Sequence, residues 1–206
     1  MTTALPESLS DRWRAAGTRT GTSTVMVISI SAETTLYEPI ETAASLAELG
    51  ASDVPVRSLF TVDMTFAPSL SAFGVTPKGV FSMAAPKAKA QFVEIVEAEG
   101  LVVDGTRETH AFEAATGTKG KWYVLDVSYP IADKLATEAD RLAAETHIAI
   151  WPTETTYGMA GGTVPLELPA GVVDTVEASI AVDPAADRER IAELIRSIDP
   201  EPAGEE

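Results

Sequence analysis

The chain has 206 residues, no cysteine, 45% hydrophobic residues and a formal net charge of -16. This length and hydrophobic content are enough for one domain with a sizeable core. The absence of cysteine excludes disulfides, thiolate catalysis and cysteine-ligated metal sites, and it suits a reducing cytoplasm. We expect a single domain over residues 5–199, followed by a disordered acidic tail over residues 200–206.

The excess of acidic residues indicates which host and which partners to expect. The isoelectric point is near 4.4 and the chain has only six lysines. Molar salt shortens the Debye length to about 3 Å and would screen the self-repulsion of such a chain, so we expect a halophilic host. An acidic surface repels phosphates, which argues against a nucleic-acid partner. No stretch approaches the roughly 20 apolar residues of a membrane span, and Met1–Ser10 lacks the apolar core of a signal peptide.

Helical spacing of apolar residues predicts four helices, each closed by a glycine or a proline. The last helix has the strongest signals, because Asp183 fits the N-cap position, Pro184 fits the first position, and Ile191, Leu194 and Ile195 form an apolar stripe. The predicted ranges are 5–16, 39–50, 86–100 and 183–199.

Between these helices, alternating apolar residues rich in β-branched and aromatic side chains predict strands. The expected strands are 22–32, 56–66, 101–114, 121–129, 146–151 and 156–166. Hairpin turns over 115–120 and 152–155 make two of the connections antiparallel. Residues 131–145 fit a short helix, although their C-terminal part also alternates into the next strand. The predicted fold class is therefore α+β: one antiparallel sheet of about six strands with flanking helices.

A search for chemistry finds no catalytic, cofactor or metal site. His110 and His147 lie singly in strand patterns without the spacing of a zinc site, and we interpret both as structural. The glycine-rich run Gly158–Gly162 also lies within a strand pattern, where glycine marks a bulge or a close approach of the backbone rather than a phosphate cradle. We therefore expect a protein that is not an enzyme.

The most unusual feature is a stretch without acidic residues. No Asp or Glu occurs between Asp63 and Glu94, whereas three of the six lysines lie in this stretch. Exposed apolar groups beside basic ones on an acidic protein are typical of an interaction surface, and the alternative is that the aromatic residues of this stretch pack into the core. The candidate partner surface consists of Phe73, Lys78, Phe81, Met83, Lys87 and Lys89.

Three function classes follow from these features. The first hypothesis is a non-enzymatic protein-binding or adaptor domain that contacts a protein partner through residues 67–90. The alternative is a small-molecule or lipid carrier, with a cavity between the helices and the sheet lined by Trp122, Trp151, Tyr157 and Met159. An enzyme would require a buried carboxylate of strongly raised pKa in a cleft.

Several motifs follow one another in a suggestive order along the chain. They are Leu36-Tyr37, LFTVDMTFAP at 59–68, Tyr129-Pro130 and IAIWPTETTYGMAGGTVP at 148–165. Together they resemble a haloarchaeal family of uncharacterised proteins, over about residues 12–198. The resemblance implies a six-stranded antiparallel sheet with flanking helices, similar to the Mog1/PsbP-like fold, and it supplies no catalytic residues.

Overall fold

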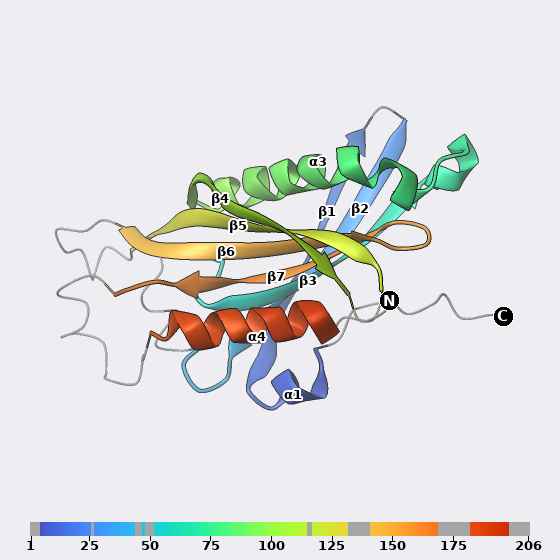
Figure 1. The fold of residues 1–206 in the computed structure, drawn as a ribbon. Coiled ribbons are helices and arrows are strands. Elements are labelled where there is room, and N and C mark those ends of the chain that lie inside the picture. Colours follow the sequence, from blue (N-terminus) through green and yellow to red (C-terminus); the bar gives the residue numbers. More distant parts are fainter. Residues whose placement is uncertain are drawn as a thin grey trace.

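One sheet with helices on both faces makes up the protein (Figure 1). The computed structural model describes residues 5–25, 27–43, 47, 52–114, 117–131, 141–168 and 182–197. Helix α3 (Pro77–Ala98) covers one face, whereas α1 (Glu7–Ser10) and α4 (Pro184–Ser197) lie on the other. None of the helices in these ranges is long and apolar enough to cross a membrane.

The sheet formed by the described residues has seven strands, all paired antiparallel. Their order is β1-β2-β3-β7-β6-β5-β4, so that α3 carries the chain from β3 in mid-sheet to β4 at the far edge. The predicted antiparallel α+β class is confirmed, and the expected count of six strands is wrong. The strands are β1 (Trp13–Val25), β2 (Ile28–Pro39), β3 (Ser58–Ala67), β4 (Val102–Glu113), β5 (Lys119–Pro130), β6 (Arg141–Pro152) and β7 (Tyr157–Pro165).

The unexpected strand is β1, where the sequence suggested a helix. The predicted helix over 5–16 ends at Ser10, and the predicted strand over 22–32 spans the turn between β1 and β2. Strand β1 is an edge strand, and Trp13 is its one buried residue among those whose side chains are described. An exposed edge strand lacks the alternation of apolar and polar residues by which strands are identified. The apolar residues at helical spacing therefore led to a helix being predicted over 5–16.

Helix α3 also begins earlier than predicted, at Pro77 rather than near Pro86. Thr76 is its N-cap, and the Thr76 hydroxyl accepts a hydrogen bond from the backbone N–H of Gly79 at 3.1 Å. Pro77 occupies the first turn, where its missing N–H costs nothing. Pro86, which suggested the start of the helix, instead lies inside it, on its exposed side.

Two further predictions fall partly outside the described residues. Residues 44–46 and 48–50 of the predicted helix over 39–50 are not described, and Pro39 ends strand β2. Residues 132–140 are likewise not described, but strand β6 begins at Arg141, so a helix reaching Glu145 is wrong. The predicted tail over 200–206 lies outside the described ranges.

The remaining elements agree with the predictions. Strands β3 to β7 occupy the expected regions, and the β4–β5 and β6–β7 pairs are antiparallel neighbours. Helix α4 starts at Pro184, and the Asp183 carboxylate accepts a hydrogen bond from the backbone N–H of Ala186 at 3.1 Å, as expected of an N-cap. Its predicted stripe of Ile191, Leu194 and Ile195 is buried.

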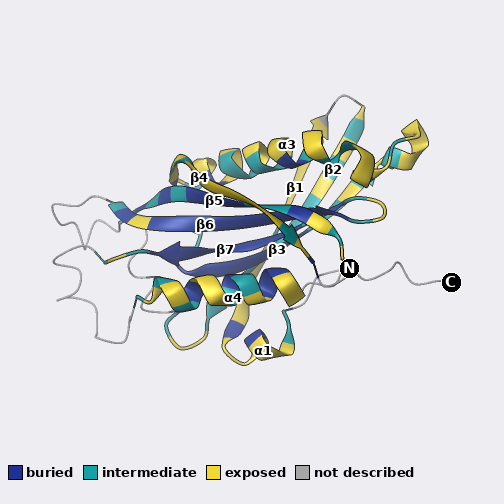
Figure 2. Ribbon diagram, in the orientation of Figure 1, coloured by how far each residue is buried: buried dark blue, intermediate teal, exposed yellow. Residues whose placement is uncertain are grey.

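Strict alternation along the central strands builds two cores, one on each face of the sheet. Tyr123, Leu125, Ile148 and Ile150 pack beneath α3, whereas Trp151 and its neighbours on the opposite face pack against α4 and α1. Figure 2 shows that the central strands are largely buried and that the edge strands β1 and β4 are largely exposed. Alternate residues of the central strands β5 and β6 therefore belong to different cores.

Candidate functional site

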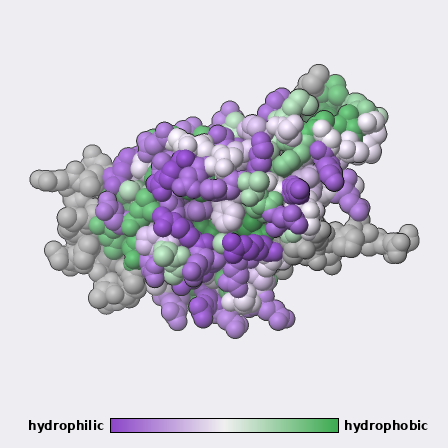
Figure 3. Space-filling view, viewed as in Figure 1, coloured by the Kyte–Doolittle hydropathy of each residue, from purple (hydrophilic) through white to green (hydrophobic). Residues whose placement is uncertain are grey.

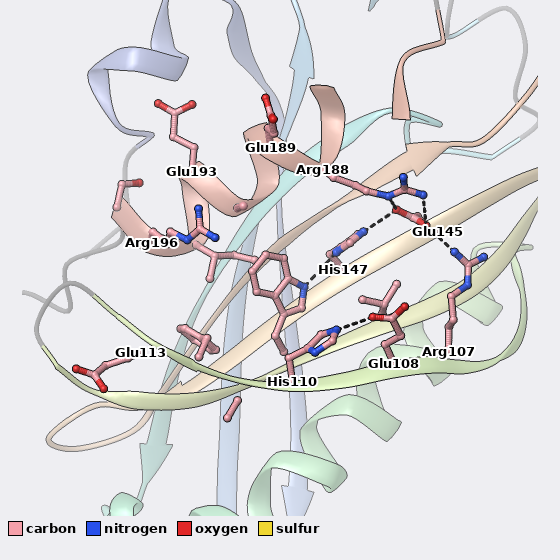
Figure 4. Close-up of a pocket in the computed structure, with 17 residues that line it drawn as sticks. Arg107, Glu108, His110, Glu113, Glu145, His147, Arg188, Glu189, Glu193 and Arg196 are labelled. Carbon is pink, nitrogen blue, oxygen red and sulfur yellow. Dashed lines mark hydrogen bonds and ion pairs between the residues drawn. The ribbon is translucent and has the colours of Figure 1, made fainter. Parts of the chain in front are cut away.

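Two hollows open on opposite faces of the sheet. The larger one, the charged basin, lies between α4 and strands β4 to β6 and has a volume of about 1470 Å³ (Figure 4). The smaller one, the apolar groove, lies between α3 and strands β1 to β3 and has a volume of about 390 Å³. They differ in chemistry, because the lining of the charged basin has many charged side chains and that of the apolar groove has one.

Glu145 is the central group of the charged basin. Its side chain is 1% exposed, and it lies directly opposite Asp126 across the β5–β6 pair, on the face of the sheet that α4 covers. Like charges at directly opposite positions of a sheet destabilise it unless cations compensate them. Two arginines from other elements provide this compensation.

Arg107 reaches these carboxylates because of a β-bulge in β4. The β4–β5 register shifts between Thr106 and Glu108, which leaves Arg107 as the extra residue. A bulge redirects the side chain of the extra residue, often beside functional sites. The Arg107 guanidinium donates from Nη1 to Glu145 Oε2 at 2.9 Å and from Nη2 to Asp126.

Arg188 provides the second cation, from the first half of α4. Its Nη2 donates to Glu145 Oε2 at 2.9 Å, and its Nε donates to Oε1, a bidentate arrangement that fixes α4 against β6. Burial by itself would raise the pKa of the Glu145 carboxyl, but hydrogen bonds from His147 and Arg188 outweigh this effect and lower the pKa to about 2. Glu145 is thus a charged carboxylate at neutral pH, and both of its oxygens accept hydrogen bonds.

His147 completes this network, and its tautomer follows from its partners. The Trp122 indole N–H, which can only donate, lies 3.1 Å from His147 Nδ1, so Nδ1 must accept. His147 Nε2 therefore carries the proton and donates it to Glu145 Oε1 at 2.8 Å. His147 is buried, and Figure 4 shows its contact with Glu145, which Arg107 and Arg188 also contact.

Stability in acid should report this network directly. The pKa of Glu145 is lowered on folding, so its contribution is complete above the ordinary value of 4.5 and is lost as the pH falls towards about 2. Since both arginines are partly exposed and screened, we expect Glu145→Gln to cost about 2 to 3 kcal/mol above pH 4.5 and almost nothing near pH 2. Urea unfolding of the wild type and of Glu145→Gln across this pH range measures the difference in their free energies of unfolding. A difference that stays the same in acid would contradict the lowered pKa of Glu145.

The remaining ionisable residues that line the charged basin are exposed, whereas Val124 and Ile195 of its lining are buried. His110 Nε2 lies 2.6 Å from Glu108 Oε2, and both side chains are about half exposed, at 54% and 52%. In the described part of the chain, no group of three or more His, Asp or Glu side chains is arranged to hold a metal ion. A general acid at neutral pH needs a raised carboxyl pKa, and that of Glu145 is lowered. The contacts of Glu145 with Arg107 and Arg188 join β4 and α4 to β6.

The apolar groove has a different lining. Its floor is formed by Ile28, Ile30, Met64 and Phe66, which all point from β2 and β3 towards α3. Its wall is a helical stripe of α3 at spacings of three and four, and Tyr157 and Met159 of β7 close its inner side. The α3 stripe consists of Val80, Ala84, Lys87, Ala88, Gln91, Phe92 and Ile95.

The structure divides the predicted partner surface. Phe73 is 48% exposed in the short 3₁₀ helix η1 (Leu70–Phe73), and Met83 is 65% exposed on α3. Phe81 is half-buried against Tyr157, which fits the alternative that aromatic residues here pack inward. In Figure 3 hydrophobic residues gather over η1 and the tip of the β1–β2 hairpin.

The three lysines of the same region also have different surroundings. Lys78 is exposed in the first turn of α3, and Lys87 is exposed at the groove. Lys89 is half-buried: its Nζ donates to Thr106 Oγ1 at 3.0 Å and lies 5.6 Å from the centre of the Tyr123 ring. The acid-free stretch is therefore partly surface and partly core, and Lys89 joins α3 to β4 and β5.

The residues predicted to line one cavity lie on both faces of the sheet. Tyr157 and Met159 line the apolar groove, whereas Trp122 lines the charged basin and Trp151 packs in the core beneath α4. Alternation separates them, because Trp151 pairs with Gly158, between Tyr157 and Met159. The Trp151 ring occupies the space a Gly158 side chain would take, with a ring atom 2.4 Å from its Cβ position, which confirms the predicted close approach.

Sequence reasoning missed several residues of both hollows. Glu145, Arg107 and Arg188 gave no signal, since each is one charged residue among many in an acid-rich chain. The alternation of Ile28 and Ile30 is visible in the sequence. That they line a groove depends on the position of α3, which the sequence does not show.

The fold and its hollows define the class: an α+β protein built on one open antiparallel sheet, with a charged basin on one face and an apolar groove on the other. Comparisons with curated proteins and with solved structures gave no significant match. The chain belongs to the family described as Domain of unknown function (DUF6517), whose model matches residues 3–199. This agrees with the expected membership of an uncharacterised family.

Proposed function

We propose that the protein is a non-enzymatic carrier that holds an apolar small molecule or lipid in the apolar groove. The observation that carries this proposal is the lining, in which Lys87 is the one charged side chain among the described residues that form the groove. Pockets for small molecules are mostly apolar and have volumes of about 300–1,000 Å³, a range that includes this groove.

The volume favours a narrow ligand over a helix of a partner protein. A helix with its side chains is about 10–12 Å wide, and roughly one turn of 5.4 Å would fill 390 Å³. A single hydrocarbon chain is much narrower than a helix, so this volume favours such a chain. Apolar surface left open to water is unfavourable, by about 25 cal/mol per Å², so an occupant of this kind would stabilise the folded protein.

The proposal is tested by filling the groove. Ala88 is half-buried and lines the groove, whereas Ala90, on the same helix, is exposed outside it. We expect the wild type to bind Nile red, a neutral apolar dye, with one site. Ala88→Trp should weaken this binding about tenfold or more, and Ala90→Trp should leave it unchanged.

Melting temperatures show whether each variant is folded, and Ala84→Phe provides a second way of filling the groove. Failure of the wild type to bind the dye, or equal binding by both Trp variants, would contradict the carrier proposal. A dimer that dissociates in Ala88→Trp, seen by light scattering, would instead show that a second copy of the chain occupies the groove.

The second candidate is the adaptor, favoured by the exposure of the large apolar side chains of Phe73 and Met83. A pull-down in molar salt distinguishes the two candidates. A stoichiometric protein partner that is lost in Phe73→Asp, while dye binding and the melting temperature are unchanged, would favour the adaptor.

We also propose a halophilic, haloarchaeal host, a cytoplasmic location and a likeness to the Mog1/PsbP-like fold. The host proposal is supported by the net charge of -16 and the few lysines, and the location by the absence of cysteine. Unfolding measured against KCl concentration tests the host assignment: a protein equally stable in low and in molar salt would contradict it.

A further inference from the structure

The opening of the apolar groove is marked by its exposed lining residues. These are Gly21 and Thr22 on β1 and Lys87, Gln91 and Ile95 on α3, whereas every other residue of the lining is at least partly buried. A ligand with an apolar chain in the groove would therefore have its polar end between β1 and the middle of α3.

The polar groups at this opening are suited to an anion. Lys87 presents an ammonium group with three donors, and the side-chain amide of Gln91, one helical turn further on, offers two more. No carboxylate lies among the described lining residues. This contrasts with a chain of net charge -16, in which an exposed site would ordinarily include acidic residues.

Lys87 is also the lysine of α3 that is available to a ligand of the groove. Within the described ranges the Lys87 side chain has neither a hydrogen bond nor an ion pair, whereas the Lys89 side chain contacts Thr106 and the Tyr123 ring. Lys78 is exposed but does not line the groove. In molar salt the acidic surface would be screened beyond about 3 Å, so a direct contact with Lys87 would decide the preference for a head group.

We infer that the ligand of the groove is a single-chain anionic amphiphile, with its hydrocarbon chain along α3 and its carboxylate at Lys87 and Gln91. This inference rests on the proposed carrier function and adds the charge of the head group. It makes Lys87 a specificity-determining residue, whereas Ile28, Ile30 and Phe66 bind the chain regardless of its head group.

The test compares decanoate with decan-1-ol, which have the same chain length and differ in head group, as competitors of Nile red in molar KCl at mildly alkaline pH. We expect Lys87→Met to lower the affinity for decanoate about fivefold and to leave that for decan-1-ol unchanged. Lys78→Met is the matched control and should change neither affinity. Lys87→Arg keeps the charge and should retain the preference for decanoate.

The outcomes separate this inference from the carrier proposal. If the dye and decan-1-ol bind but Lys87→Met leaves decanoate binding unchanged, or weakens both competitors equally, the anionic head group is wrong and the carrier stands. If the wild type binds neither the dye nor either competitor, both proposals are overturned.

Discussion

Replacing Asp187 with alanine is expected to lower the free energy of unfolding by about 3 to 5 kcal/mol, because it breaks a buried ion pair from one side. Asp187 is 3% exposed and Arg57 is 8% exposed, and Arg57 Nε donates to Asp187 Oδ2 at 2.8 Å. Arg190 donates to the other carboxylate oxygen. The Asp187 carboxylate thus joins the first turn of α4 to the residue that precedes β3.

Two controls separate this charge effect from a general weakening of α4. Glu189→Ala, at an exposed position two residues further on, should change stability by less than about 0.5 kcal/mol. The double variant Arg57→Met with Asp187→Leu removes both charges and should recover a large part of the loss. Denaturant unfolding in molar salt measures all three, and an Asp187→Ala protein as stable as the wild type would contradict the buried pair.

Gly161→Ala should be similarly damaging, for a steric reason. Gly161 lies in the middle of β7, paired with Phe60 of β3 and Ile148 of β6. A Cβ atom here would lie 1.9 Å from the backbone oxygen of His147 and 2.8 Å from the Phe60 ring. Since the carbonyl belongs to the neighbouring strand, relief requires the sheet to move, and we expect a loss of about 3 kcal/mol or more.

The matched control for this substitution is Gly21→Ala in edge strand β1, where a Cβ atom would have no other atom within 4 Å. Alanine is slightly better than glycine within a strand, so Gly21→Ala should be neutral or mildly stabilising. Thermal unfolding of both variants compares them. Equal melting temperatures would show that β7 has more freedom than the close contact implies.

The fold was predictable where burial makes a regular pattern. Helix α4 combines a cap at Asp183 with an apolar stripe, and the central strands alternate because each faces two different cores. Strand β1 was missed because only Trp13 among its described side chains is buried, so its sequence reflects solvent rather than a core. The start of α3 was missed because Pro77 and Pro86 both fit a first turn.

The site was less predictable than the fold, because it depends on contacts between distant segments. Nothing in the sequence near Arg107 indicates the bulge that turns its side chain towards Glu145. Arg188 is 43 positions away from the same carboxylate. The lysines of the acid-free stretch were identified, but only the position of α3 shows that Lys87 borders the groove and that Lys89 is engaged elsewhere.

The order of the strands also determines how the chain must close on itself. Strands β1 to β3 form one meander and β4 to β7 form another, each from consecutive strands. Among the described residues, the strands of the two meanders pair in one ladder, between Ser58–Asp63 and Gly158–Thr163. Closing that single ladder encloses α3 and three strands in one loop, so much of the loop-closure entropy of the fold is concentrated there. The apolar groove extends across this seam, with β2 and β3 on one side and Tyr157 and Met159 of β7 on the other. A molecule bound in it would hold the two meanders together.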